Sequence, residues 1–354
     1  MAKLADAPDL GSGAARRGGS SPLFRTISSY KEFKMQYQES TLQELLQTLI
    51  NQTKTTHQLQ NQILMSNCIA NAKIPKKDKQ LLLLLLQDRD RNYLRINHNP
   101  QVFERITQYL ELLRPVKVAR DSLVRIGGKN DGGYVMSKTH LKMGGGANSP
   151  YLKNPKAISL GVSDYSPWDW EMAELGYQVI EYDGSIEKSP YTHPNITFHK
   201  KFVGLHDEDS TITLKSLLQD NKLDKTQANI LQIDIENAEW EMLEGIEIGI
   251  LAEFFAQIIF EFHGCNPEEE QGFHQRITQL KRLNEFFCPI HLHFNNHGKI
   301  FYSQGLFFST SIEVSYLNQK FIADKTKRIS EGVLENLDTP TWISNPEIPI
   351  RFKK

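Results

Sequence analysis

The fold is decided by residues 157–184, which read AISLGVSDYSPWDWEMAELGYQVIEYDG. A short apolar run ends at Gly161, a helix-like run follows over Trp168–Leu175, and a second apolar run ends at Asp183. Strands that alternate with helices predict βαβ crossovers and a mainly parallel sheet, covered by helices on both faces. Ligands of such sheets bind beyond the carboxyl ends of the strands. We therefore expect the functional residues at strand ends.

The alternation continues toward the carboxyl terminus, with apolar runs at 196–203, 228–234, 257–262, 290–294 and 307–314 and helical patterns at 214–218, 239–246 and 272–287. Toward the amino terminus the pattern changes. Leu42, Leu45 and Leu49 recur at helical spacing, which predicts a helical region over residues 27–116. We expect these helices either to pack as an appendage or to contact a partner or a second copy.

Residues 1–26 differ in composition from the rest, because they are rich in Gly, Ala and Arg. We expect a disordered leader. Gly19-Ser-Ser-Pro22 back-translates to a sequence that resembles the T arm of a transfer RNA gene. One hypothesis is therefore a misplaced start codon, and the alternative is a genuine flexible tail.

Composition narrows the class of protein. The 354 residues carry 41 Lys and Arg against 42 Asp and Glu, so a binder of nucleic acid through positive charge is not expected. The three cysteines form no CxxC pair, which favours a reducing compartment. The longest apolar run, Leu81–Leu86, is far shorter than the roughly 20 residues of a membrane span, and no secretory signal is present. We expect a cytoplasmic protein.

Two strand ends predict a nucleoside site. A glycine after the first strand lets a ligand approach the backbone, and an acid after the second is placed to accept hydrogen bonds from ribose hydroxyls. The residues expected to bind a cofactor here are Gly161, Val162, Ser163, Asp164, Asp183 and Gly184. The first loop lacks the Gly-x-Gly-x-x-Gly pattern of dinucleotide sites and is acidic. It therefore suits S-adenosylmethionine, which carries a sulfonium cation and no phosphate.

Four motifs resemble those of the FkbM-like methyltransferases: RIGGKNDGGYVM at 125–136, SLGVSD at 159–164, IDIENAEWE at 233–241 and HLHFNN at 291–296. The resemblance covers about Val118–Leu317 and departs from the family at Asn237, where glycine is common. It implies a Rossmann-like class I methyltransferase with a seven-stranded sheet, in a domain placed at 117–320 and followed by an extension over 321–354. It also implies S-adenosylmethionine as donor, Asp183 as the ribose acid, and transfer to oxygen on a sugar, glycan or small metabolite.

The candidate catalytic residues also lie at strand ends. Asp234, Glu236 and Glu239 follow an apolar strand, where they are positioned to bind the donor, order the acceptor or act as general base. His263 ends the next strand and is a second candidate base, or else a structural histidine. Alternation puts His293 on one face with Asn295. We interpret this face as one that contacts the acceptor, and the alternative is a face that is merely polar at the end of the sheet.

We assign no metal from the sequence, because carboxylates of unknown geometry are weak grounds for Mg²⁺ or Ca²⁺. Two competing functions stay open. One is a nucleotide-sugar or NAD-dependent enzyme on a similar sheet, and the other is a noncatalytic binding or scaffold module.

Overall fold

The computed structural model describes residues 22–87, 94–141, 152–330 and 332–353, and only the backbone of residues 22–41. The chain divides into two compact units, Met1–Asn67 and Cys68–Lys354. Each unit is described below by itself.

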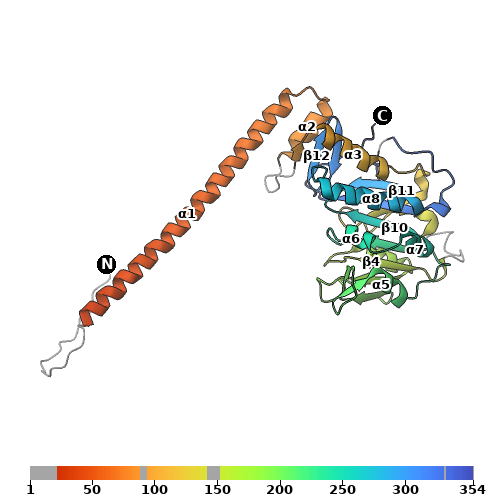
Figure 1. Ribbon diagram of the computed structural model, residues 1–354, viewed down its shortest axis with the longest axis horizontal. Helices are drawn as coiled ribbons and strands as arrows, with labels where there is room; N and C mark the ends of the chain where they lie inside the picture. Colours follow the sequence, from red (N-terminus) through yellow and green to blue (C-terminus); the bar gives the residue numbers. More distant parts are fainter. Residues whose placement is uncertain (1–21, 88–93, 142–151, 331, 354) are drawn as a thin grey trace, which may run out of the picture. The chain divides into compact units, whose positions relative to one another are not determined.

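A single helix, α1 (Pro22–Asn71), forms the described part of the first unit (Figure 1). Of the predicted leader, residues 1–21 lie outside the described residues, and residues 22–26 belong to this helix. Its leucines are largely exposed, with Leu42 at 64% and Leu49 at 59%. Among the described residues, no helix is both long and apolar enough to cross a membrane.

The second unit is built on a seven-stranded sheet in the order β11-β14-β10-β9-β4-β5-β6. In chain order the strands are β4 (Lys156–Leu160), β5 (Gln178–Tyr182), β6 (Ile196–His199), β9 (Asn229–Ile233), β10 (Phe255–Phe262), β11 (Phe287–Phe294) and β14 (Ile312–Asn318). The predicted seven strands are confirmed, but the expectation of a mainly parallel sheet is wrong. The sheet is mixed, because β14 runs antiparallel to both of its neighbours, β10 and β11.

The helices of the second unit are α2 (Lys76–Leu85), α3 (Pro100–Leu113), α4 (Pro167–Glu174), α5 (Leu214–Asp220), α6 (Glu239–Glu244), α7 (Ile248–Phe254) and α8 (Glu270–Phe286) (Figure 1). Those from α4 to α8 join strands of the sheet. Helix α3 packs on α8, since the Tyr109 and Phe273 rings meet edge to face at 5.3 Å. The Nδ2 of Asn284 also donates to the carbonyl of Leu112 at 2.7 Å. Residues from the predicted helical region thus pack against the sheet-containing unit.

Three smaller sheets complete the second unit: β1 (Leu94–Ile96) with β12 (Ile300–Ser303) and β13 (Leu306–Ser309), β2 (Leu123–Ile126) with β3 (Tyr134–Ser137), and β7 (Phe202–Gly204) with β8 (Thr211–Thr213). Two strands expected as single runs are therefore divided. The run at 196–203 forms β6 and β7, and the run at 307–314 forms β13 and β14, in different sheets. An apolar run cannot by itself show where a chain leaves one sheet for another.

The central strands are buried on both faces, as near-continuous apolar runs require. Leu160, Ile233 and Phe260, one from each of three adjacent strands, have no exposed surface. Full burial of such a side chain stabilises the fold by about 1.5–3 kcal/mol. This rigid centre holds the carboxyl ends of β4, β9 and β10 side by side.

Candidate active site

A cavity of about 460 Å³ opens at the carboxyl ends of β4, β5 and β9. Its size is in the range of small-ligand sites, about 300–1,000 Å³. Strand order reverses between β4 and β9, which is the usual place for a ligand in an open α/β sheet. The lining includes Asp131, Tyr134, Gly161, Val162, Ser163, Asp164, Tyr182, Asp183, Gly184, Ser185, Lys201, Phe202, Asp234 and Glu236.

Gly161 lies in the loop after β4 and allows the loop after β9 to pack closely against it. Its φ of +80° is in the left-handed region, and a Cβ built on it would lie 1.7 Å from the carbonyl oxygen of Asp234. The backbone N–H of Asp234 in turn donates to the carbonyl of Leu160 at 2.8 Å. Only glycine allows two loops to approach this closely, so the residue is required by the backbone geometry.

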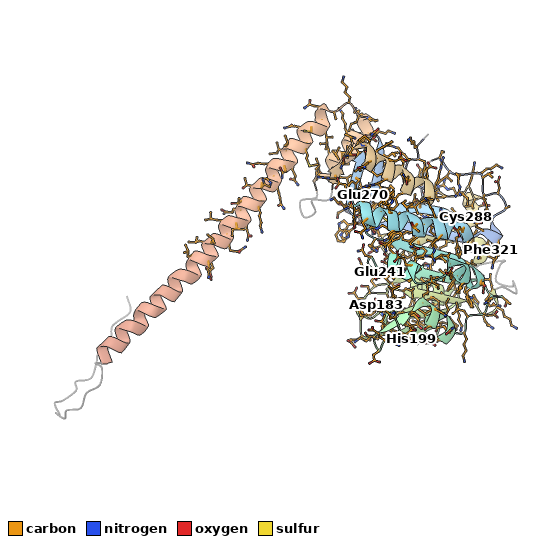
Figure 2. The ribbon with its side chains drawn as sticks, in the orientation of Figure 1. Asp183, His199, Glu241, Glu270, Cys288 and Phe321 are labelled. Carbon is orange, nitrogen blue, oxygen red and sulfur yellow. The ribbon has the colours of Figure 1, made fainter. Side chains whose placement is uncertain are left out.

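Asp183 organises the same loop with hydrogen bonds. Its Oδ2 accepts the backbone N–H groups of Val162 at 2.9 Å and Ser163 at 2.8 Å. Its Oδ1 accepts the N–H of Ser185 at 2.7 Å and the hydroxyl of Ser185 at 2.6 Å. Figure 2 shows Asp183 near His199, whose carbonyl accepts the Asp183 N–H at 3.2 Å.

These contacts decide the charge of Asp183. Burial alone would raise the pKa of its carboxyl group, but the hydrogen bonds from Ser185, Ser163 and Val162 hold the pKa below its usual value. Asp183 is therefore an ionised and rigidly held carboxylate that shapes the cavity wall.

The predicted cofactor residues all meet at this cavity. Gly161, Val162, Ser163, Asp164, Asp183, Gly184 and Asp234 line it together. Sequence reasoning missed the part of the wall formed by Ser185, Lys201 and Phe202. Phe202 begins β7 and lies against Gly184, where an added Cβ would meet the ring at 2.3 Å. The sequence predicts a single strand over 196–203 with Phe202 inside it, so it gives no sign that Phe202 lies on a cavity wall.

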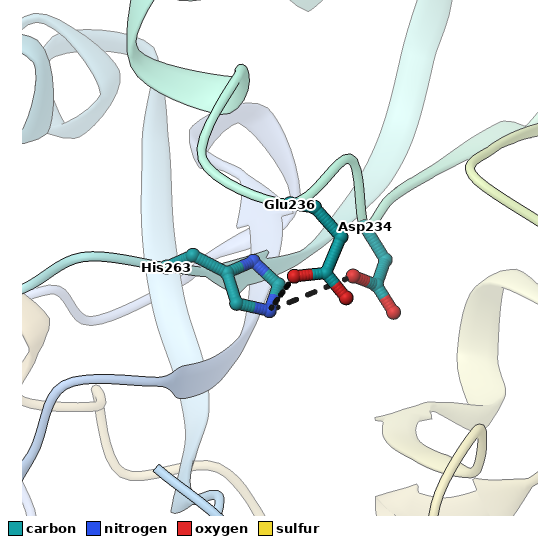
Figure 3. A group of neighbouring side chains, drawn as sticks. All are labelled: Asp234, Glu236 and His263. Atoms are coloured by element: carbon teal, nitrogen blue, oxygen red, sulfur yellow. Dashed lines mark ion pairs between the residues drawn. The ribbon is translucent and has the colours of Figure 1, made fainter. Parts of the chain in front are cut away.

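Three side chains converge at the ends of β9 and β10 (Figure 3). The Nε2 of His263 lies 3.9 Å from Asp234 Oδ1, 3.7 Å from Glu236 Oε2 and 3.6 Å from Glu261 Oε1. The other ring nitrogen, Nδ1, lies 3.1 Å from Oε1 of the fully buried Glu239. The structure thus brings together the predicted candidates Asp234, Glu236, Glu239 and His263.

The electrostatics of this cluster favour different protonation states for its members. Burial lowers the pKa of His263, but the hydrogen bond with Glu239 and the charges of the nearby carboxylates outweigh it and raise the pKa to about 10. Burial and the charge of Glu261 raise the pKa of Asp234 well above its usual value. Burial also raises the pKa of Glu261 to about 7, with the charge of Glu313 adding to it. His263 is therefore held as a cation beside Asp234 and Glu261, whose pKa values are raised.

His293 lies away from the cavity, contrary to its predicted contact with an acceptor. Its side chain is fully buried, with Nδ1 3.0 Å from Glu313 Oε2 and Nε2 2.9 Å from Glu347 Oε1. Asn295, predicted on the same face, donates from Nδ2 to Glu261 Oε1 at 2.6 Å. His293 is thus a structural link between β11 and the carboxyl-terminal segment, because both ring nitrogens already face carboxylates.

The turn before β3 forms another part of the wall, with Asp131 and Tyr134 on the cavity. The carboxyl-terminal segment holds this turn. The backbone N–H of Asn130 donates to the hydroxyl of Thr339 at 2.9 Å, and its Nδ2 donates to the carbonyl of Pro340 at 2.7 Å. Residues about 210 positions apart in the sequence therefore fix the place of Asp131.

Comparisons with known proteins agree with this geometry. The model of the family described as "Methyltransferase FkbM domain" matches residues 91–287, more than half of the 354 residues. The human protein named "Probable methyltransferase-like protein 24" is 27% identical over 123 residues, which cover 31% of this chain and 33% of the human protein. The match thus spans about a third of that relative. From the family match, the chain belongs to the FkbM methyltransferase domain family.

Proposed function

We propose that the chain is an S-adenosylmethionine-dependent methyltransferase of class I fold, which methylates an oxygen of a sugar, glycan or small metabolite. The observation that carries the proposal is the convergence of the Gly161 loop, Asp183 and the acidic cluster on one cavity. The strand order supports the fold. Numbered along the chain within this sheet, β4, β5, β6, β9 and β10 are strands 1 to 5, and their order in space is 3-2-1-4-5, as in the doubly wound nucleotide-binding sheets.

The charge of the cavity fits a cationic donor better than a dinucleotide. Asp131, Asp164, Asp183, Asp234 and Glu236 line it, and Lys201 is the one lysine or arginine in its described lining. Phosphates would be repelled by this set, whereas a sulfonium and an ammonium group would be attracted. The Gly161 loop also leaves the backbone open to close approach of a ligand.

We assign the donor to the region between Asp183 and Asp234. Asp183 is already ionised and fixed by the loop, and a ribose hydroxyl that binds it takes the place of the Ser185 hydroxyl on Oδ1. Phe202, half-exposed on the cavity wall, offers an apolar ring face to a base. Asp234 and Glu236 lie on the other side, where an acceptor hydroxyl meets the donor.

The proposed reaction assigns one role to each group in the cluster. The donor supplies an electrophilic methyl group, and the acceptor oxygen bonds to this carbon as the carbon–sulfur bond breaks and its electron pair returns to sulfur. Asp234 accepts the hydroxyl proton, for which its raised pKa is suited. His263, held as a cation by Glu239, stabilises the negative charge that develops nearby. Proximity supplies much of the remaining rate.

Calorimetry with the two competing cofactors tests the proposal first. We expect saturable binding of S-adenosylmethionine and none of NAD⁺ at the same concentrations. Binding of NAD⁺ alone would instead support the dinucleotide enzyme, and binding of neither would support a noncatalytic module.

Incubation with methyl-labelled S-adenosylmethionine and fractionated cell extract then tests the acceptor class. We expect label in a glycan or small-metabolite fraction that survives mild base, as an ether does. Label confined to protein or nucleic acid would contradict the proposed acceptor.

A further inference from the structure

We propose that Asp234, Glu236 and His263 bind one divalent metal ion of the Mn²⁺ kind at the edge of the cavity. Each of the three offers one ligand atom, and these atoms all lie within 4.8 Å of one another. The combination of carboxylate oxygens with one imidazole suits Mn²⁺, which accepts both oxygen and nitrogen ligands.

The spacing of the ligand atoms carries the first step. His263 Nε2 is 3.9 Å from Asp234 Oδ1 and 3.7 Å from Glu236 Oε2, too far for hydrogen bonds. Ligands bonded at about 2.0–2.2 Å to one ion lie roughly 3.0–3.6 Å apart at tetrahedral or octahedral angles. The three atoms are therefore close to the separation that a shared ion needs, and small rotations of the side chains complete it (Figure 3).

The orientation of His263 carries the second step. Glu239, fully buried, holds Nδ1 at 3.1 Å and also accepts the backbone N–H of Ile235 at 3.1 Å. A carboxylate on one ring nitrogen fixes the tautomer and directs the other nitrogen to a metal, as in many metal sites. In the described structure Nε2 faces Asp234, Glu236 and Glu261, each at 3.6–3.9 Å.

The balance of charge carries the third step. Four carboxylates, those of Asp234, Glu236, Glu239 and Glu261, surround one imidazole. Within the described residues, no lysine or arginine forms an ion pair with any of them, and the Oε2 of Glu239 is buried without a hydrogen-bond partner. The group stays negative even with His263 protonated, and an ion that binds Nε2 displaces the proton of that nitrogen. Glu239 and Glu261 are buried, and buried charge is costly unless a cation compensates it, as a divalent ion does.

The ion would be reached from the cavity and would bind the acceptor. Asp234 and Glu236 both line the cavity, so an ion held there also faces any acceptor in it. A metal ion polarises a bound hydroxyl and orients it toward the donor. This role rests on the proposed function, and it replaces the role assigned there to the cationic His263. The proton then leaves to the oxygen of Asp234 that does not hold the ion.

The test is a titration of the full chain with MnCl₂ at about pH 8, followed by the EPR signal of free Mn²⁺. We expect saturation at one ion per chain. Glu236→Gln, which changes a side chain that is 84% exposed, should weaken Mn²⁺ binding at least tenfold, and His263→Ala should do the same. Glu241→Gln, an exposed glutamate on α6, is the matched control and should bind as the intact chain does.

Two results would overturn the proposal: no saturable Mn²⁺ binding by the intact chain, or binding by Glu236→Gln and His263→Ala that is as tight as that of the intact chain. Calorimetry of donor binding in the presence of EDTA separates failure of the metal site from failure of the proposed function. Donor binding without Mn²⁺ binding rejects only the metal site, and Mn²⁺ binding without donor binding rejects only the proposed function.

Discussion

Asp183 and Asp234 end the strands on either side of the Gly161 loop and line the same cavity, yet their surroundings differ. Asp183 accepts four hydrogen bonds, which keep its pKa low. Asp234 faces His263 at 3.9 Å and lies among carboxylates, and its pKa is high. One carboxylate is thus built to hold a fixed charge, while the other can exchange a proton. We propose that Asp183 belongs to a binding half of the cavity and Asp234 to a reactive half.

The strongest test of this contrast is Asp234→Asn, which keeps the size of the side chain and removes its proton-accepting oxygen. We expect turnover with the labelled donor to fall by about 10²–10⁴, the range for loss of a general base. The dissociation constant of the donor should change much less. Glu241→Gln serves as control, and an equal loss of donor affinity and turnover in Asp234→Asn would assign Asp234 to binding instead.

Asp183→Asn should produce the opposite pattern, because it breaks the binding half. An amide places N–H groups against backbone N–H donors, and each lost bond to a charged group is worth about 1.5–3 kcal/mol. We expect donor affinity, measured by calorimetry, to fall by roughly 10- to 100-fold. Asp224→Asn is a close control, since Asp224 also accepts an N–H and a hydroxyl, both from Thr226, but on an exposed turn. Unchanged donor affinity in Asp183→Asn would remove Asp183 from the site.

Gly161→Ala tests the junction between the two halves. A positive φ in an alanine costs about 1–2 kcal/mol, and the clash with the Asp234 carbonyl adds about 1–3 kcal/mol of overpacking. Gly305→Ala isolates the first contribution, because Gly305 has a φ of +91° and nothing within 4 Å of an added Cβ. We expect a larger loss of unfolding free energy in chemical denaturation for Gly161→Ala than for Gly305→Ala. Equal losses would show that the two loops separate easily.

The sequence could predict that Gly161 and Asp183 lie close together, because the signals for this are local. Gly161 and Asp183 each follow an apolar strand, and parallel strands bring such ends together. The reversal of β14 had no local signal, because an apolar run buried on both faces reads alike in either direction. His293 was misplaced for a related reason. Its partner Glu347 returns from 54 residues away, in a segment without regular strands or helices that could announce it.

Glu181 and Asp183 lie close together in the sequence, yet their pKa values shift in opposite directions. Glu181 lies two residues before Asp183 on β5 and is fully buried, and burial, with the charge of Asp169 adding to it, raises its pKa to about 8. A carboxyl group with a raised pKa favours the folded state while it is protonated. This contribution is complete below the unfolded value of about 4.5 and is lost as the pH rises through about 8.

The intact chain should therefore lose stability as the pH rises toward 8, and Glu181→Gln should remove the part of this loss that Glu181 causes. We expect the unfolding free energy of the intact chain to fall relative to the variant by about 2 kcal/mol between pH 6 and pH 8, within the limit of about 1.4 kcal/mol per pH unit for one proton. Denaturant titrations at several pH values measure the difference. Glu187→Gln, with a side chain 85% exposed, should follow the intact chain throughout. If the unfolding free energies of Glu181→Gln and the intact chain depend on pH in the same way, Glu181 ionises as it does in water. The pKa values of Glu181 and Asp183 would then not differ as described.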